Sequence, residues 1–490
     1  MPGLCAPAVI PGLDAVEGLW QPLSRLPWSG WDAAWLGDTL AGRNAVLIFL
    51  PLLAVLLLWP VRHLRRGFIL TGLLFVGYVF GAAYLVFWLL SCLLFYRLSE
   101  QFAREVRRTD VWPGGPPLAA IAIISVYFVL LHVLDAVNLP AAANAGLLQY
   151  APWALPLGAR GLSWEPHWFG TESQLFALML RDSHNIGAAY LVMRMVHYFS
   201  ELKRGTIPAE QRSFARFLAY LCYVPTLIQG PIERYAEFNH QIDTCHERRT
   251  WRDRLAGLGR LGQALVKAVV LEAYLLPWAN SQGLGSRQFM QHPEHTTSYV
   301  LLFFSIHVLV FALYLAFSAY CDVAIGMSRL LGYRAAENFR HFWLACSLTD
   351  MWRRWHITLS FILRDYIFFP LARRRWNSFL ALAVTFLVCG LWHSLSLNYA
   401  LWGLTMGLLV AINQRWSRWQ RQLDRQPDHR LARLRRAWLR LWPLPRICAW
   451  LLTINVFMLS GWVCFWGFRG FRVLGELIWR PLSWLFAGQP

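Results

Sequence analysis

Long apolar runs separated by short basic segments dominate the chain. A helix needs about 20 apolar residues to cross the hydrocarbon core of a bilayer, and most of the runs approach this length. We predict helical spans at 44–60, 68–80, 82–97, 118–137, 184–200, 214–229, 262–279, 299–318, 320–332, 378–392, 397–413 and 447–467. The pattern therefore predicts an all-α polytopic membrane protein.

Two stretches, 214–229 and 341–370, mix apolar with polar residues. Irregular backbone at membrane depth is tolerated only where protein surrounds it, so we expect re-entrant or embedded helices there. The 68–97 stretch is about twice the length of one crossing if it is not broken. Gly77 and Gly81 favour a tight turn within it, and a continuous helix is the alternative.

The distribution of charged residues predicts how the chain is oriented across the membrane. The net charge is +19, and basic loops beside apolar helices stay in the cytoplasm. The segments expected on that side are 62–66, 97–108, 203–212, 247–254 and 415–446. The last also has Trp and Leu at helical spacing, which predicts an amphipathic surface helix rather than a nucleic-acid-binding arm. The 138–180 loop carries few charges and is expected outside.

Composition supports a membrane protein. The chain is 57% hydrophobic and 15% charged, whereas soluble domains run at roughly 45–50% and about 25%. Its nine cysteines contain no CxxC pair, so we predict neither a disulfide nor a metal site. The first 44 residues lack the basic start and apolar core of a signal peptide. We divide the chain into an N-terminal extension (1–44), a membrane domain (45–470) and a C-terminal tail (471–490).

Two histidines stand out because apolar sequence surrounds them: His356 in MWRRWHITLSFILRDYIFFPL and His393 in FLVCGLWHSLSLNYALWGL. An ionisable side chain at membrane depth is expensive and is a functional candidate by default. A neutral imidazole can take a proton from a hydroxyl and pass it on. The alternative is a satisfied core histidine. His197 and His307 also lie inside spans and are weaker candidates.

Charged residues accompany the first histidine. Arg353 and Arg354 precede His356 and would suit an anionic acyl carrier, although a snorkelling interfacial cluster has the same pattern. Asp350 is expected to cap the helix that follows it. Asp322 lies within an apolar helix and needs a partner, and Asn398 is a polar neighbour of His393.

Five motifs resemble the membrane-bound O-acyltransferase (MBOAT) family, in its bacterial branch of alginate O-acetyltransferase and teichoic-acid D-alanyl transfer proteins. They are LCYVPTLIQGPIERYAEF (221–238), FSAYCDVAIGMSRLLGY (317–333), NFRHFWLACSLTDMWRRWHITLSFILRDYIFFPL (338–371), CGLWHSLSLNYALWG (389–403) and GWVCFWGFRG (461–470). The chain departs from the family's pattern at two places. Ser394-Leu395 stands where the family has a pair of small residues, and Ala372-Arg373-Arg374-Arg375 stands where it often has a glycine-rich turn.

The resemblance implies a ring of about 10–12 transmembrane and re-entrant helices around a central tunnel. It maps the family's catalytic histidine onto His393 and the companion histidine onto His356. The residues themselves, rather than the resemblance, suggest that Arg353 and Arg354 hold the donor and that Asp322 and Asn398 support the site. The implied reaction moves an acetyl group from a cytoplasmic thioester, acetyl-CoA, toward hydroxyls of an exported polysaccharide, with no permanently bound cofactor and no metal.

The implied setting is the bacterial inner membrane, where the chain crosses the lipid bilayer several times. A periplasmic acyltransferase- or esterase-like protein and the polysaccharide machinery are the expected partners, and no nucleic acid is expected. Three alternatives remain open: D-alanyl or other acyl transfer to a cell-envelope polymer, a transporter or flippase, and a non-catalytic membrane scaffold.

Overall fold

The computed structural model describes residues 43–80, 82–109, 186–227, 229–282, 299–393, 397–426, 429–468, 470–475 and 477. Helices and turns make up these ranges, and no strand occurs within them. The all-α class is therefore confirmed. The predicted span 118–137 and the predicted outer loop 138–180 lie outside the described residues.

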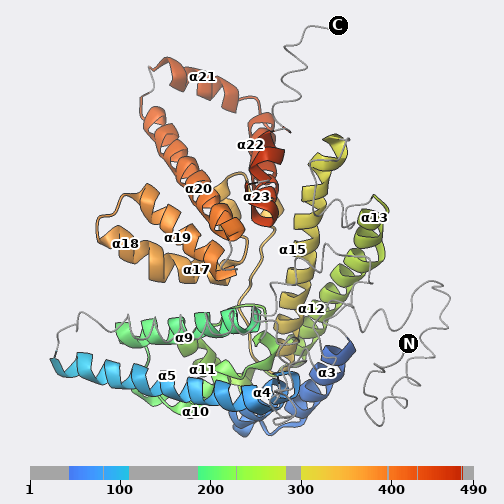
Figure 1. The fold of residues 1–490 in the computed structure, drawn as a ribbon, viewed down its shortest axis with the longest axis vertical. Helices are drawn as coiled ribbons and strands as arrows, with labels where there is room; N and C mark the ends of the chain where they lie inside the picture. The colour runs from blue at the N-terminus through green and yellow to red at the C-terminus, as the bar shows by residue number, and fades with distance from the viewer. Residues whose placement is uncertain are drawn as a thin grey trace, which may run out of the picture. The chain divides into compact units, whose positions relative to one another are not determined.

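The chain divides into two compact units (Figure 1). The first takes in residues up to 229, 233–274 and 322–335. Its helices are α3 (Arg43–Leu58), α4 (Leu64–Phe80), α5 (Ala82–Thr109), α9 (Ile186–Arg204), α10 (Phe214–Leu221), α11 (Tyr235–Asp243) and α12 (Trp251–Val269). An aromatic core joins α4, α9, α10 and α11 through Phe68, Tyr198, Phe217 and Phe238, each of which is fully buried.

The second unit takes in residues 230–232, 275–321 and 336 onward. Its helices are α13 (Leu276–Ser281), α16 (Leu348–Trp352), α17 (Ile357–Leu363), α18 (Phe369–Arg373), α19 (Ser378–His393), α20 (Leu397–Asp424), α21 (Arg430–Leu439), α22 (Leu444–Leu459) and α23 (Gly461–Trp466). Helix α15 (Tyr299–Leu330) gives residues up to 321 to this unit and its last turns to the first. The three short helices α16 to α18 fall in the 341–370 stretch where embedded helices were expected.

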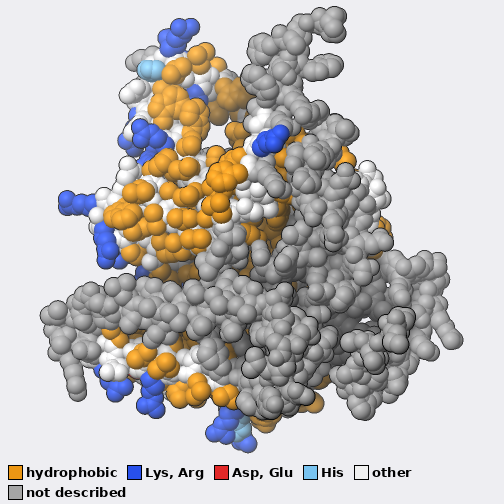
Figure 2. Space-filling view, in the orientation of Figure 1, with side chains coloured by type: hydrophobic (Ala, Val, Ile, Leu, Met, Phe, Trp, Pro, Cys, Tyr) orange, Lys and Arg blue, Asp and Glu red, His pale blue; other side chains and the backbone are white. Residues whose placement is uncertain are grey.

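Within the described residues, three helices are long and apolar enough to cross a membrane: Trp251–Ala279, Val300–Leu330 and Leu444–Trp466. Ser378–His393 is a shorter apolar helix. Hydrophobic side chains cover a broad area over α18 to α20 in Figure 2, and Lys and Arg lie at its margins. Exposed Leu380 and Ile412 belong to these helices. Contiguous exposed apolar surface of this kind is what a lipid-facing surface requires.

Three sequence predictions about helix boundaries are wrong. Residues 299–332 were expected to form two spans, but α15 is one helix to Leu330. No Gly or Pro interrupts 317–320, and the Asp322 carboxylate forms ion pairs with Arg260 at 2.8 Å and Lys267 at 2.5 Å, so its charge does not end the helix. Both cations come from α12.

The other two differences concern basic segments. Segment 97–108 was expected as a loop, yet it is the end of α5. Segment 415–446 was expected as one surface helix, but α20 runs to Asp424 and α21 starts at Arg430. Helix α4 is described up to Phe80 and α5 from Ala82. Of the two glycines in the predicted turn, Gly77 lies within α4 and Gly81 lies outside the described residues.

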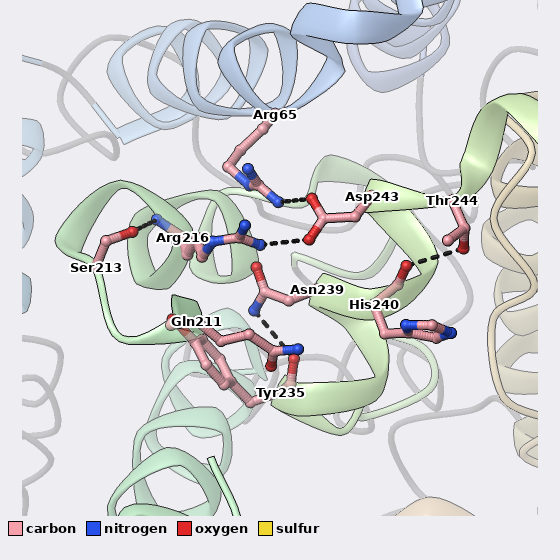
Figure 3. A network of polar contacts seen from close by, with 9 residues as sticks. All are labelled: Arg65, Gln211, Ser213, Arg216, Tyr235, Asn239, His240, Asp243 and Thr244. Atoms are coloured by element: carbon pink, nitrogen blue, oxygen red, sulfur yellow. Dashed lines mark hydrogen bonds and ion pairs between the residues drawn. The ribbon is translucent and has the colours of Figure 1, made fainter. Parts of the chain in front are cut away.

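One carboxylate links three helices of the first unit (Figure 3). Asp243, the last residue of α11, accepts hydrogen bonds from Arg216 of α10 at 2.7 Å and from Arg65 of α4. Burial raises the pKa of Asp243, but the hydrogen bonds and positive charges of Arg216 and Arg65 outweigh it, so the pKa lies below its ordinary value. The ionised carboxylate therefore stabilises this corner of the fold.

Glycines bring α19 and α20 into close contact in the second unit. A Cβ atom on Gly390 would lie 2.1 Å from the Tyr399 carbonyl oxygen, and one on Gly403 would lie 2.3 Å from the Phe386 carbonyl oxygen. Small residues allow such backbone approach between helices in lipid, where close packing is a main source of association. This packing sets His393, the last residue of α19, beside the first turns of α20.

We expect Gly403→Ala to lower the thermal stability of the protein in detergent, by about 1–3 kcal/mol for an overpacked contact. The reason is that the new methyl group meets backbone, which cannot move aside locally. Gly262→Ala is the matched control, because a Cβ atom there has no neighbour within 4 Å among the described residues. Equal melting temperatures for the two variants would contradict the close α19–α20 contact.

Asp243→Asn should destabilise the protein at neutral pH and make no difference in acid. Because the folded-state pKa is lowered, the stabilisation is fully present above the ordinary carboxyl pKa of about 3.9 and disappears as the pH falls through the folded-state pKa. Melting temperatures of wild type and variant, measured across this range, should converge at low pH. Glu210→Gln, at an exposed carboxyl, is the control. The difference in melting temperature between this variant and wild type should not change with pH as it does for Asp243→Asn.

Candidate active site

The site is built around a break between α16 and α17. His356 lies in this break with φ 44° and ψ 54°, which is the left-handed region. Non-glycine residues rarely adopt it, and such strain costs about 1–3 kcal/mol and persists only where the surroundings impose it. Segment 338–340 imposes it here: the Ile357 N–H donates to the Asn338 carbonyl, and the Arg340 N–H donates to the Arg354 carbonyl, both at 2.9 Å.

His356 is buried, with 2% of its surface exposed. Its ring centroid lies 4.8 Å from Phe317 of α15 and 5.9 Å from Trp392 of α19, both in edge-on arrangements. Aromatic contacts from two helices therefore fix the plane of this imidazole.

His393 lies next to it. The two imidazole centroids are 6.5 Å apart, so the structure brings the two histidine motifs close together. Tyr399 and Trp402 of α20 lie at 6.1 Å and 5.9 Å from the His393 ring. At this separation the two imidazoles are too distant for a direct hydrogen bond, so they can act on different atoms of a bound molecule.

The sequence prediction treated both histidines as buried, and the structure gives them different surface exposure. His356 is buried, but the structure places His393 among the exposed residues. The physical reason is position, because His393 ends α19 whereas His356 sits between packed segments. Ser394 and Ser396, its expected polar neighbours, lie outside the described residues.

The predicted donor-binding arginines are in different environments. Arg353 is exposed at the end of α16. Arg354 forms an ion pair with Asp350 at 3.0 Å. The prediction that Asp350 caps this helix is wrong, because Ser347 is the N-cap and its hydroxyl oxygen accepts the Asp350 N–H at 3.1 Å. Asp350 instead forms an ion pair with Arg354, and Arg353 is the more exposed of the two arginines.

Asp322 and Asn398 are engaged elsewhere. Asp322 belongs to the first unit, where Arg260 and Lys267 neutralise it. Asn398 donates to the Phe465 carbonyl at 3.3 Å and so links the start of α20 to the end of α23. These contacts link each residue to a neighbouring helix, and the supporting role of both residues in the site stays a prediction.

The weaker histidine candidates are also engaged elsewhere. His197 accepts the Tyr235 N–H at 2.8 Å. His307 lies between the Phe303 carbonyl at 2.8 Å and the Asn455 side-chain oxygen at 3.1 Å, which links α15 to α22. Across the described part of the chain, no three His, Cys, Asp or Glu side chains gather as metal ligands would.

Sequence reasoning missed Asn338. This residue is fully buried, and its side-chain oxygen accepts the N–H of Thr358 at 3.2 Å and the hydroxyl of Thr358 at 2.9 Å. A polar residue at the start of the NFRHFW string was the available signal, but nothing in the sequence identified its partner 20 residues away.

The chain is similar in sequence to known membrane-bound enzymes. A family model described as MBOAT, membrane-bound O-acyltransferase family, matches residues 124–454. The chain belongs to the membrane-bound O-acyltransferase family. With its long apolar helices, it is a multi-pass membrane protein.

Individual relatives of this chain are also acyl-transfer proteins by name. A probable alginate O-acetylase AlgI from Pseudomonas putida is 32% identical over 233 residues, covering 47% of this chain and 45% of the relative. A peptidoglycan O-acetyltransferase from Helicobacter pylori is 30% identical over 267 residues, covering 53% and 45%. A teichoic acid D-alanyltransferase from Streptococcus thermophilus is 27% identical over 322 residues, covering 60% and 70%. The chain spans less than half the length of the first two.

Proposed function

We propose that this protein is an O-acyltransferase that moves an acetyl group from a thioester donor, acetyl-CoA, toward hydroxyls of an exported polysaccharide. The observation that carries the proposal is the pairing of His356 and His393 at 6.5 Å within a chain of this family. The names of the alginate and peptidoglycan relatives favour acetyl as the acyl group and a polysaccharide as the acceptor.

The proposed chemistry starts at the exposed histidine. His393 takes the proton of the acceptor hydroxyl, and the hydroxyl oxygen attacks the thioester carbonyl carbon. The carbon–sulfur bond then breaks, and the leaving thiolate receives the proton from His393. The products are an ester and a thiol, so the imidazole returns to its starting state. A positioned base of this kind typically contributes about 10²–10⁴-fold.

His356 has a different role in the proposal. It is buried behind His393, and Phe317 and Trp392 hold its ring. A fixed polar group acts best where charge develops during the reaction. We assign His356 to orienting the reacting groups and stabilising the oxygen of the thioester carbonyl.

The proposed setting is the bacterial inner membrane. Arg353 faces the donor from the cytoplasmic side, as the basic segments require by the positive-inside rule. A periplasmic acyltransferase- or esterase-like protein and the polysaccharide machinery are the proposed partners. D-alanyl transfer is the second candidate, because the D-alanyltransferase relative matches the longest part of this chain among the three relatives described.

His393→Ala should abolish acetylation of the exported glycan while the protein stays in the membrane, because it removes the base proposed to take the proton of the acceptor hydroxyl. Mass spectrometry of the glycan, with and without the gene, measures the acyl group directly. A D-alanyl mass difference in place of acetyl would select the second candidate.

His307→Ala is the matched control, because it removes another histidine from an apolar helix without touching the pair. We expect it to retain acetylation. Full acetylation by a stably inserted His393→Ala variant would refute the assignment of the base.

Arg353→Ala should raise the KM for the donor by about 10–100-fold with little change in kcat, because a hydrogen bond to a charged group contributes roughly 1.5–3 kcal/mol. Initial rates in membrane vesicles at varied donor concentration measure this. Arg373→Ala removes an exposed arginine of α18 and serves as the control. An unchanged donor KM in Arg353→Ala would exclude a donor contact.

A further inference from the structure

The first backbone N–H groups of α17 need hydrogen-bond acceptors from outside the helix. The first N–H groups of a helix have no partner within it, and the residue at the N-cap usually supplies one from a Ser, Thr, Asp or Asn side chain. Here His356 occupies the N-cap, and its side chain makes no capping hydrogen bond.

Asn338 supplies the cap instead, from a separate segment. Its carbonyl accepts the Ile357 N–H at 2.9 Å, and its side-chain oxygen accepts the Thr358 N–H at 3.2 Å. Two successive amides at the start of α17 are therefore satisfied by one residue. The Thr358 hydroxyl also donates to the same Asn338 oxygen at 2.9 Å.

The cap extends to a third segment. The Ile232 N–H donates to the Thr358 hydroxyl at 3.0 Å, and the Asn338 amide donates to the Gly230 carbonyl at 3.3 Å. Thr358, Asn338 and Ile232 are all at least nine-tenths buried. The QGPI string (229–232) and the histidine string (352–360) are thus held together by Asn338, which fixes the backbone on both sides of His356.

We propose that Asn338 is a positioning residue for the acyl transfer. By capping α17 in place of His356, it holds the left-handed backbone of that residue and keeps the imidazole against Phe317, Trp392 and His393. The proposal rests on the proposed function, since it gives the cap a consequence for the reaction as well as for the fold.

The test compares Asn338→Ala with Thr358→Val in the full chain in membrane vesicles, with acetyl-CoA as the varied donor. Asn338→Ala removes the side-chain acceptor and should lower kcat about 10²-fold, the size expected for a displacement of about 1 Å at a reacting group. Thr358→Val removes only the bridging hydroxyl and should lower kcat about tenfold. The donor KM should stay within about threefold in both, because neither residue contacts the donor.

Asn413→Ala is the matched control. Asn413 caps α16 in the same way, since its side-chain oxygen accepts the N–H and the hydroxyl of Thr349 at 3.3 Å and 3.0 Å. Helix α16 also has its own cap in Ser347, so the control should change kcat by less than about threefold. A merely structural role for Asn338 would lower the melting temperature and leave kcat unchanged, as in the control.

Each outcome of this comparison of kcat values either supports the proposal or contradicts it. A kcat loss in Asn338→Ala and Thr358→Val that exceeds the control supports the proposal, and equal kcat values in all three overturn it. If Asn338→Ala does not accumulate in the membrane, Thr358→Val decides alone by the same criterion. A wild-type chain that transfers no acyl group refutes the proposed function, and this result is distinguishable because the variants and wild type are then equally inactive.

Discussion

The hydrogen bonds that Asn338 accepts from the start of α17 are the interaction on which the rest of the site depends. In the interior of a membrane protein, water is not available to satisfy backbone amides, so a helix can start there only where protein supplies acceptors. Asn338 does so for Ile357 and Thr358. His356 can consequently occupy a strained left-handed position without serving as the cap itself. Loss of these acceptors would leave buried amides unpaired and release the strain at the same point.

The second histidine is positioned by a different kind of interaction. Lipid tails are as apolar as leucine, so helices in a bilayer associate through close packing and hydrogen bonds rather than through the hydrophobic effect. Gly390 and Gly403 let the backbones of α19 and α20 approach until a methyl group would not fit. The end of α19 is thereby fixed relative to Tyr399 and Trp402, which contact His393. One histidine thus depends on hydrogen bonds to a loop and the other on the packing of two helices.

The sequence predicted what local patterns determine. Apolar runs located α3, α19 and the start of α20 to within about two residues, and the two histidine motifs converge as expected. The sequence predictions failed where contacts with residues distant in the sequence determine the local structure. Asp322 does not interrupt α15, because α12 supplies its countercharges. The residue that caps α17, Asn338, lies 19 residues before the helix begins. Left-handed backbone at His356 is likewise imposed by neighbours and leaves no trace in periodicity or composition.

The unequal exposure of the two histidines separates their roles. In the proposed reaction, the general base must meet the acceptor hydroxyl. His393 is the more exposed of the two imidazoles, so the proposal has the acceptor approach from that side. Water that reaches the same imidazole competes as a nucleophile and would hydrolyse the thioester. The rings of Tyr399 and Trp402 beside His393 restrict this space. His356, sealed behind Phe317 and Trp392, is shielded from water, where a fixed dipole acts more strongly than it would in solvent. The arrangement therefore combines an accessible base with a dry polar group, and transfer is favoured over hydrolysis only while both conditions hold.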